Sequence, residues 1–285
     1  MKIAVASGKG GTGKTTVATN LAFVAAAAGR SVVYVDCDVE EPNGHLFLKP
    51  QITASESVGR LIPRVDLQTC TFCGQCGQIC QYSAIAPLAD DVLVFPELCH
   101  SCGGCWLVCP VGAIGEVERP TGRVETGRAG EVRFVQGVLN VGEARSTPVI
   151  QAAKAASPQV DLVILDAPPG TSCPVIEVVR GADFALLVGE PTPFGLNDFK
   201  LAAAMLREIG IRFGVAVNRA DLADPEALSF YRGGRAPVLA EIPDDRRVAE
   251  AYSRGRLACE VVDGYRALFD RLLAGLLKEA ASAAS

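Results

Sequence analysis

Residues 2–16 are KIAVASGKGGTGKTT, and this stretch predicts both the fold class and the first binding site. A short apolar run, Ile3 to Ala6, leads through a glycine-rich loop into the alanine-rich segment Thr15 to Ala28. A strand, a loop that ends in Gly-Lys-Thr and a helix form a phosphate-binding loop, whose backbone N–H groups surround phosphate oxygens. The expected nucleotide ligands are Gly8, Lys9, Gly10, Gly11, Thr12, Gly13, Lys14, Thr15 and Thr16. Lys14 is expected to reach the β- and γ-phosphates, and the Thr15 hydroxyl to bind Mg²⁺.

The alternation of apolar runs and helical stretches continues on both sides of a different, central zone. Val32 to Val35 is a second β-branched run, and Leu162 to Leu165, Ala185 to Val188 and Val215 to Val217 follow later, interleaved with helical stretches such as Phe199 to Ile209. Strands separated by helices predict a parallel sheet. We therefore expect an α/β fold, a P-loop NTPase core with a mainly parallel sheet flanked by helices.

Composition excludes several classes of protein. The chain has 285 residues, of which 49% are hydrophobic and 21% charged, and its net charge is −5. Its apolar runs are far shorter than the roughly 18 residues of a membrane span, and it lacks the broad basic footprint of a nucleic-acid binder. Because no apolar signal segment precedes the glycine-rich loop, we expect a cytoplasmic protein without a membrane span and without a nucleic-acid partner.

The central zone is rich in cysteine and free of basic residues. Between Asp66 and Glu118 there are six carboxylates and no Lys or Arg. Eight of the 11 cysteines fall within residues 70–109, in two copies of the pattern Cys-x₂-Cys-x₂-Cys-x₃-Cys that are offset by 29 residues. Reduced thiols at this density favour metal binding over disulfides, and the repeat predicts two equivalent sites.

This cysteine pattern is typical of bacterial two-cluster ferredoxins, in which the fourth cysteine of each run serves the other cluster. The first [4Fe–4S] cluster would take Cys70, Cys73, Cys76 and Cys109. The second would take Cys80, Cys99, Cys102 and Cys105. A zinc site is the alternative, although zinc ribbons use separated cysteine pairs. Pro110 follows the second run as this pattern expects, whereas Gln81 stands at the corresponding place in the first.

These zones predict an ATPase core that is interrupted by an inserted, small α+β ferredoxin-like domain. Residues 1–65 are expected to form the first segment of the core, with the phosphate loop, and residues 66–118 the inserted domain. Residues 119–146, with alternating segments such as Val132-Arg133-Phe134-Val135, are expected to be connecting hairpin strands. Residues 147–285 are expected to complete the core as its second segment.

The phosphate loop carries a second lysine, Lys9, and thereby resembles the deviant Walker A motif of the MinD/ParA/Mrp family, which includes the nitrogenase iron protein. This resemblance implies that Lys9 reaches the partner's nucleotide in a homodimer that depends on nucleotide. Asp36-Cys37-Asp38 resembles the family's switch I, and Asp166 to Thr171 its switch II. The resemblance implies catalytic roles for Lys9, Lys14 and Asp38, with Asp38 positioning the attacking water. It further implies Mg²⁺ binding by Thr15, Asp36 and Asp166, γ-phosphate sensing by the Gly170 N–H, and base binding by Asn218.

Three cysteines lie outside the two runs, at positions 37, 173 and 259. Cys173 follows Asp166 at the offset at which the nitrogenase iron protein carries a ligand of its bridging cluster, but the region of the other ligand, Val141 to Ala144, has no cysteine. The paired C-terminal cysteines of Mrp-type carriers are also missing, since only Cys259 lies there. We interpret Cys37 and Cys173 as packing residues.

Three functions remain open from the sequence. The first is ATP-gated electron transfer from two [4Fe–4S] clusters to an unidentified acceptor protein, with ATP or ADP and Mg²⁺ at the phosphate loop. The second is an iron–sulfur or metallocofactor assembly factor that acts on a client protein. The third is a spatial organiser like MinD or ParA, for which the amphipathic segment Tyr265 to Lys278 could act as a membrane-binding tail.

Overall fold

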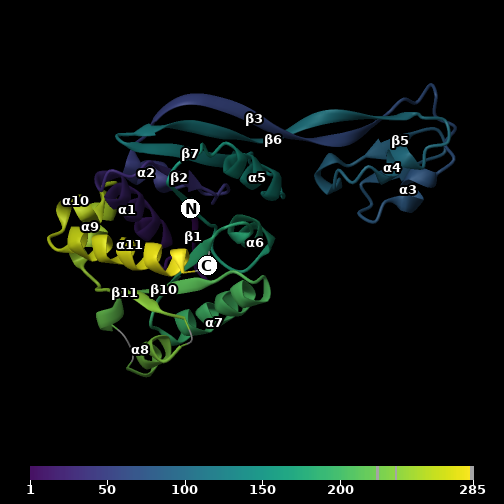
Figure 1. Ribbon diagram of the computed structural model, residues 1–285. Coiled ribbons are helices and arrows are strands. Elements are labelled where there is room, and N and C mark those ends of the chain that lie inside the picture. Colours follow the sequence, from purple (N-terminus) through teal and green to yellow (C-terminus); the bar gives the residue numbers. More distant parts are fainter. Residues whose placement is uncertain (223–224, 235, 283–285) are drawn as a thin grey trace.

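A nine-stranded sheet forms the centre of the computed structural model, which describes residues 1–222, 225–234 and 236–282 (Figure 1). Neighbouring strands are parallel from β11 through β7, and the last two strands, β6 and β3, are antiparallel. In spatial order the strands are β11 (Val238–Ile242), β10 (Phe213–Asn218), β9 (Phe184–Gly189), β1 (Lys2–Ala6), β8 (Leu162–Asp166), β2 (Val32–Asp36), β7 (Val132–Leu139), β6 (Ile114–Ala129) and β3 (Gln51–Val65). This mostly parallel sheet confirms the expected α/β class.

Helices cover both faces of the sheet, and the strands contribute apolar side chains to the two core layers between the sheet and these helices. Side chains alternate along a strand, so Ile3 points into one layer while Ala4 points into the other. The first layer contains α1 (Lys14–Ala27), α2 (Gly44–Leu48), α9 (Arg246–Ser253), α10 (Ala258–Val261) and α11 (Tyr265–Ala281). The second contains α5 (Thr147–Ala155), α6 (Cys173–Val179), α7 (Pro193–Glu208) and α8 (Pro225–Arg232), while the short η2 (Ala220–Leu222) follows β10.

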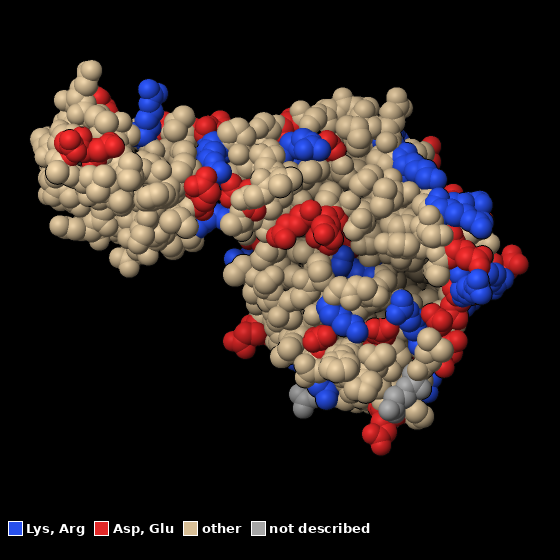
Figure 2. All heavy atoms as spheres, turned by 180° about the vertical axis from the view of Figure 1, so that it is seen from behind, with Lys and Arg blue, Asp and Glu red and all other residues tan. Residues whose placement is uncertain are grey.

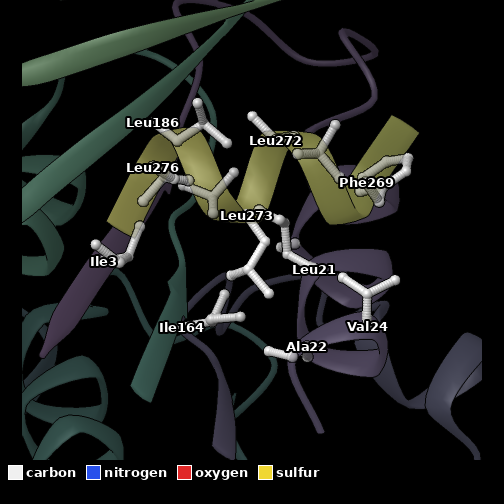
Figure 3. Close-up of a cluster of buried hydrophobic side chains, with 14 of the residues drawn as sticks. Ile3, Leu21, Ala22, Val24, Ile164, Leu186, Phe269, Leu272, Leu273 and Leu276 are labelled. Carbon is white, nitrogen blue, oxygen red and sulfur yellow. The ribbon is translucent and has the colours of Figure 1, made fainter. Parts of the chain in front are cut away.

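The helix α11 is part of the core. Phe269, Leu272 and Leu276 are at most 1% exposed and lie with Leu21 of α1 over the sheet (Figure 3). Burial of a large aliphatic or aromatic side chain contributes about 1.5–3 kcal/mol. The apolar side of α11 is therefore occupied within the molecule, which argues against the membrane-tail interpretation of this segment.

A long two-stranded arm, formed by the outer parts of β3 and β6, leaves the sheet at one edge (Figure 1). β6 pairs with β7 only over Gly122 to Ala129, whereas its pairing with β3 continues from there outward to Ile114. The register between β3 and β6 shifts at Val58/Gly59, close to the point where β7 ends. Such bulges bend and twist a ribbon, and here the ribbon departs from the sheet.

The arm carries the cysteine lobe, which we define as residues 66–113. The Asp66 N–H donates to the Ala113 carbonyl at 2.8 Å and closes the lobe at its base. Its elements are short: α3 (Gln75–Ile79), β4 (Ile85–Pro87), β5 (Val92–Val94), η1 (Pro96–Leu98) and α4 (Gly104–Leu107). In space-filling view the lobe stands apart from the core, and its surface is mostly uncharged with patches of acidic side chains (Figure 2).

The segment that we expected to connect insert and core, residues 119–146, does contain an antiparallel hairpin, formed by β6 and β7, but only β6 extends to the cysteine lobe. Val132, Phe134 and Val135 do form a strand, but this strand, β7, is buried and pairs in parallel with β2, so it belongs to the core sheet. The arm consists of the outer parts of β3, which we expected within the first core segment, and of β6. β6 begins at Ile114 inside the expected insert and continues to Ala129 in the expected connecting segment. Alternating apolar residues indicate a strand but not its partners, because pairing depends on tertiary contacts. The domain division itself stays a prediction, and its last residues, 283–285, lie outside the described residues.

Candidate functional site

The phosphate loop lies between β1 and α1, and its conformation depends on glycine. Gly11 and Gly13 have φ angles of 77° and 88°, in the left-handed region that glycine adopts without a steric penalty. A Cβ atom at Gly13 would also collide with the side-chain amide of Asn218, whose Nδ2 donates to the Thr12 carbonyl at 2.8 Å. The end of β10 thus holds the loop that begins α1.

We predict that Gly13→Ala lowers the free energy of unfolding by about 1–3 kcal/mol, because the new side chain meets both a left-handed backbone and Asn218. Gly10→Ala is the matched control, since a Cβ there meets nothing within 4 Å and its φ is not positive. Its effect should stay within about 0.5 kcal/mol. Urea unfolding of both variants measures the difference, and equal stabilities would contradict the strain argument.

Lys14 is buried beside two carboxylates at the ends of neighbouring strands. Asp36 and Asp166 are register partners in β2 and β8, and Lys14 Nζ lies 2.7 Å from Asp166 Oδ1. Burial opposes the charged form of Lys14, but Asp166, Asp38 and Asp36 together outweigh it, and the pKa of Lys14 is raised. The buried Tyr34 hydroxyl donates to Asp166 Oδ2 at 2.8 Å, which fixes the carboxylate further.

Asp36 and Asp38, the two aspartates of the predicted switch I, lie at and just after the end of β2. Asp36 accepts the Gly44 N–H at 2.8 Å and the Asp38 N–H at 3.1 Å. Burial and the neighbouring Asp166 raise the pKa of Asp36 to about 7, and burial raises that of Asp38 to about 6. Carboxylates held together away from water repel one another, and a hard divalent cation with oxygen preference, such as Mg²⁺, relieves this repulsion.

Lys9 forms an ion pair with a different acidic residue from the one that Lys14 contacts. Its Nζ lies 2.9 Å from Oε2 of Glu190, which directly follows β9. Glu190 Oε1 also lies 2.6 Å from Nη1 of Arg219, a residue with the unusual φ of 56°. Burial alone would raise the pKa of Glu190, but hydrogen bonds from Lys9 and Arg219 outweigh it, so this pKa is lowered.

An open cavity of about 510 Å³ extends from the phosphate loop to α9 and α11. Its lining contains eight of the nine predicted loop residues, from Lys9 to Thr16, together with Asp38 and Asn218. Ile242, Val248 and Tyr252 form part of an apolar wall against which a nucleotide base can pack. The volume and the mixed lining suit a nucleotide.

Four predicted residues lie outside the wall of this cavity. Gly8 packs so closely against Asp198 that a Cβ would collide with the Asp198 carbonyl. Asp36 and Asp166 lie beneath Lys14 and are at most 1% exposed. Gly170, with a φ of 97°, donates its N–H to the Ser7 carbonyl at 3.0 Å. This N–H must leave Ser7 before it can contact a γ-phosphate.

In the cysteine lobe, the eight cysteines separate into two hollows. The first is lined by Cys70, Cys73, Cys76 and Cys109. The second is lined by Cys80, Cys99, Cys102 and Cys105. Each hollow thus takes three cysteines from one run and the fourth from the other run. Among the residues that the structure describes, no three His, Cys, Asp or Glu side chains converge tightly enough to hold a single metal ion.

The internal repeat extends to backbone geometry and to hydrogen bonds on sulfur. Phe72 and Ser101, 29 residues apart, have φ angles of 54° and 52°, and their N–H groups donate to Cys70 Sγ and Cys99 Sγ, each at 3.4 Å. Ala84 and Ala113 likewise donate to Cys80 Sγ at 3.3 Å and Cys109 Sγ at 3.2 Å. Backbone N–H groups directed at sulfur stabilise thiolates.

The CobQ/CobB/MinD/ParA nucleotide binding domain family matches residues 3–258. The chain belongs to this family. An uncharacterized protein of Methanocaldococcus jannaschii is 36% identical over 222 residues, which are 77% of this chain and 78% of that protein. The iron–sulfur cluster carrier protein of Aquifex aeolicus is 26% identical over 272 residues, or 89% of this chain and 60% of that protein.

Solved structures of the MinD type share the fold of this MinD/ParA-family chain. The septum site-determining protein MinD from Pyrococcus horikoshii, solved with Mg-ADP, aligns over 99% of this chain and 98% of its own with a TM-score of 0.61. At 21% identity, this similarity establishes the fold alone. Among the helices of the described residues, none is long and apolar enough to cross a bilayer.

Four residues near the two sites were not predicted from the sequence: Tyr34 and Glu190 in the core, Arg60 in the arm, and Glu143, which pairs with Arg60. Tyr34 and Glu190 had a weak signal. Tyr34 places a hydroxyl within an aliphatic strand, and Glu190 places a charge directly after another aliphatic strand. Arg60 and Glu143 had none. Of the three cysteines outside the runs, Cys37 and Cys259 are buried and Cys173 is exposed, so the expected packing role of Cys173 does not fit its position. The catalytic and metal-binding roles assigned from the sequence stay predictions.

Proposed function

We propose that this chain is an ATPase whose nucleotide state controls two [4Fe–4S] clusters in the cysteine lobe, and that the lobe passes single electrons to a partner protein. The observation that carries the proposal is the division of eight cysteines into two hollows of four, each completed by the fourth cysteine of the other run. This crossed division is the arrangement of bacterial two-cluster ferredoxins.

The residues of both hollows suit such a cluster. Each offers four sulfur ligands around one hollow, and backbone N–H groups donate to two sulfurs of each set. Cys70, Cys73, Cys76 and Cys109 would hold the first cluster, and Cys80, Cys99, Cys102 and Cys105 the second. When bound, a [4Fe–4S] cluster takes up or releases one electron, often at low potential. The electron would come from a low-potential one-electron donor and leave to an acceptor protein.

The core supplies the nucleotide chemistry of the proposal. Lys14 would neutralise the β- and γ-phosphates, while Thr15, Asp36 and Asp166 would hold Mg²⁺ directly or through water. Asp38, at the cavity wall, would orient the attacking water, and positive charge would stabilise the transferred phosphoryl group. Binding of the γ-phosphate would draw the Gly170 N–H away from Ser7, which makes switch II the element with two arrangements.

A homodimer completes this site in the proposal. In the single chain Lys9 pairs with Glu190 and not with the carboxylates around Lys14. Its ammonium can therefore reach a nucleotide across an interface only after it leaves Glu190. We propose that MgATP favours the dimer in which this exchange occurs.

The deciding experiment is an anaerobic EPR redox titration of the full-length protein, with and without MgATP, alongside iron and sulfide analysis. We expect about eight irons per chain and two one-electron midpoints, at least one of which shifts with MgATP. Absence of iron–sulfur signals after reconstitution would refute the cluster assignment. Clusters with potentials and electron-transfer rates indifferent to MgATP would refute the gating.

A carrier or assembly factor is the second candidate, because a relative that aligns over 89% of this chain is named an iron–sulfur cluster carrier protein. A carrier must release its cluster, so incubation of the loaded protein with an apo-ferredoxin should transfer iron and sulfide in a nucleotide-dependent way. In the electron-transfer proposal the iron stays with the lobe and only the oxidation state of the acceptor changes. The two candidates therefore differ in where the iron is found afterwards.

A further inference from the structure

A buried cluster of charges lies where the arm joins the core. Arg60 of β3 and Arg119 of β6 are directly opposite one another in the antiparallel ladder, so two like charges stand side by side. Glu143, from the core loop between β7 and α5, lies between them. Its Oε1 is 3.3 Å from Arg60 Nη2 and its Oε2 is 3.5 Å from Arg119 Nη1.

Within this charge cluster, Arg60 and Glu143 are shielded from solvent, whereas Arg119 is partly exposed. The side chains of Arg60 and Glu143 are 5% and 3% exposed, whereas that of Arg119 is 27% exposed and also pairs with Glu97. A buried guanidinium requires partners for its N–H groups, because an unpaired buried charge is strongly destabilising. The partners of Arg60 are therefore informative about its role.

Arg60 extends from Glu143 into the cysteine lobe. Its Nη2 donates to the Pro96 carbonyl at 2.8 Å, and its Nη1 donates to the carbonyl of Cys99. Cys99 lines the second hollow. A full positive charge thus contacts the backbone of one of the four cysteines of this hollow.

The first hollow has a different environment. None of the described residues that line either hollow is a Lys, Arg, Asp or Glu, and residues 66–113 contain no Lys or Arg. The two hollows differ in that Arg60, from the arm, bonds to the backbone of a cysteine of the second. A second cation, Arg145, is also near Arg60: burial, with Arg60 as the next cause, lowers the pKa of Arg145. A buried guanidinium therefore lies directly beside the second hollow.

We propose that Arg60 is a positioning residue that makes the two clusters unequal, raising the reduction potential of the one at Cys80, Cys99, Cys102 and Cys105 above that of the other. The inference rests on the proposed function, because it requires both clusters. Reduction adds a negative charge, which a nearby buried guanidinium stabilises, and charge and hydrogen bonds around the sulfurs are known determinants of cluster potential. Glu143 offsets part of this positive charge from the core side.

The test is an EPR-monitored redox titration of the full-length, cluster-loaded protein. We expect Arg60→Gln to move one midpoint to lower potential and leave the other in place, whereas Glu143→Gln moves the same midpoint to higher potential. Arg60→Lys, which keeps the charge, should restore most of the wild-type value. Arg64→Gln, at an exposed arginine four residues along the same strand, is the matched control and should move neither midpoint. Cys102→Ser, which alters a ligand of the second cluster, identifies the midpoint that belongs to it.

Several outcomes would overturn the inference. These are an Arg60→Gln variant in which neither midpoint moves or both move equally, and a Glu143→Gln variant whose midpoint moves downward. If Arg60→Gln fails to retain its iron, Glu143→Gln and Arg60→Lys still decide, since both keep the positive charge at position 60. A wild-type protein that binds no clusters would refute the proposed function itself, and iron analysis before each titration distinguishes that failure from this one.

Discussion

Lys9→Ala is expected to lower the rate of ATP hydrolysis by about three orders of magnitude, while MgATP affinity of the single chain stays within about fivefold. Cations that stabilise the transferred phosphoryl group across an interface contribute on this scale. In the single chain Lys9 is part of a partly exposed ion pair with Glu190, and such pairs contribute about 1 kcal/mol or less. Phosphate release and calorimetric titration measure the two quantities separately.

Lys278→Ala is the matched control for this variant, because Lys278 lies near the end of α11 and is not part of the cavity lining. It should hydrolyse ATP at the wild-type rate. Analytical ultracentrifugation with a non-hydrolysable ATP analogue then tests whether Lys9→Ala still dimerises. A Lys9→Ala protein that hydrolyses ATP normally would show that Lys9 is a surface lysine and that the deviant loop is incidental.

The second large effect concerns the crossed division of the cysteines. The variant with both Cys73→Ala and Cys109→Ala is expected to lose about four irons per chain, because both residues line the first hollow. The variant with both Cys73→Ala and Cys80→Ala is expected to lose about eight, because these residues belong to different hollows although they lie in the same run. Iron and sulfide analysis after anaerobic purification provides the measurement.

The reverse order of losses would mean that each cluster takes its four ligands from one run. Cys173→Ala is the control, since Cys173 is exposed and lies outside the cysteine lobe, at the start of α6. It should keep the full iron content. The first double variant is also a test of folding, because it should retain the signal of the second cluster.

The candidate nucleotide site combines residues of very different origin. The loop from Lys9 to Thr16 was predicted as a unit because its glycines, lysine and threonines are contiguous, and backbone geometry within a few residues determines it. Asp166 follows Lys14 by 152 positions, yet their side chains meet. The sequence suggested this contact only through a resemblance to a known family, since no local pattern relates the ends of β1 and β8.

Strand pairing shows the limit of local patterns more clearly. The alternation in Val132 to Val135 predicts a strand, and β7 is one, but the same alternation suits an external hairpin or a core strand. The tertiary structure makes it a core strand: β7 is buried between β2 and β6, and Val132 and Phe134 pack in one layer of the core. Strand β3 escaped prediction for a related reason: its half nearest the core is largely exposed and lacks a strong apolar pattern.

The sequence by itself determined the parallel α/β class, the phosphate loop and the two cysteine runs with their repeat, since each depends on residues that lie close together in the chain. Only the tertiary structure decided the pairing of Lys9 with Glu190, the arm of β3 and β6, and the contact of Arg60 with Glu143 and the Cys99 carbonyl. These contacts join residues 39 to 181 positions apart. Such ion pairs and hydrogen bonds form only when the folded sheet places the strands and loops that carry the two residues side by side.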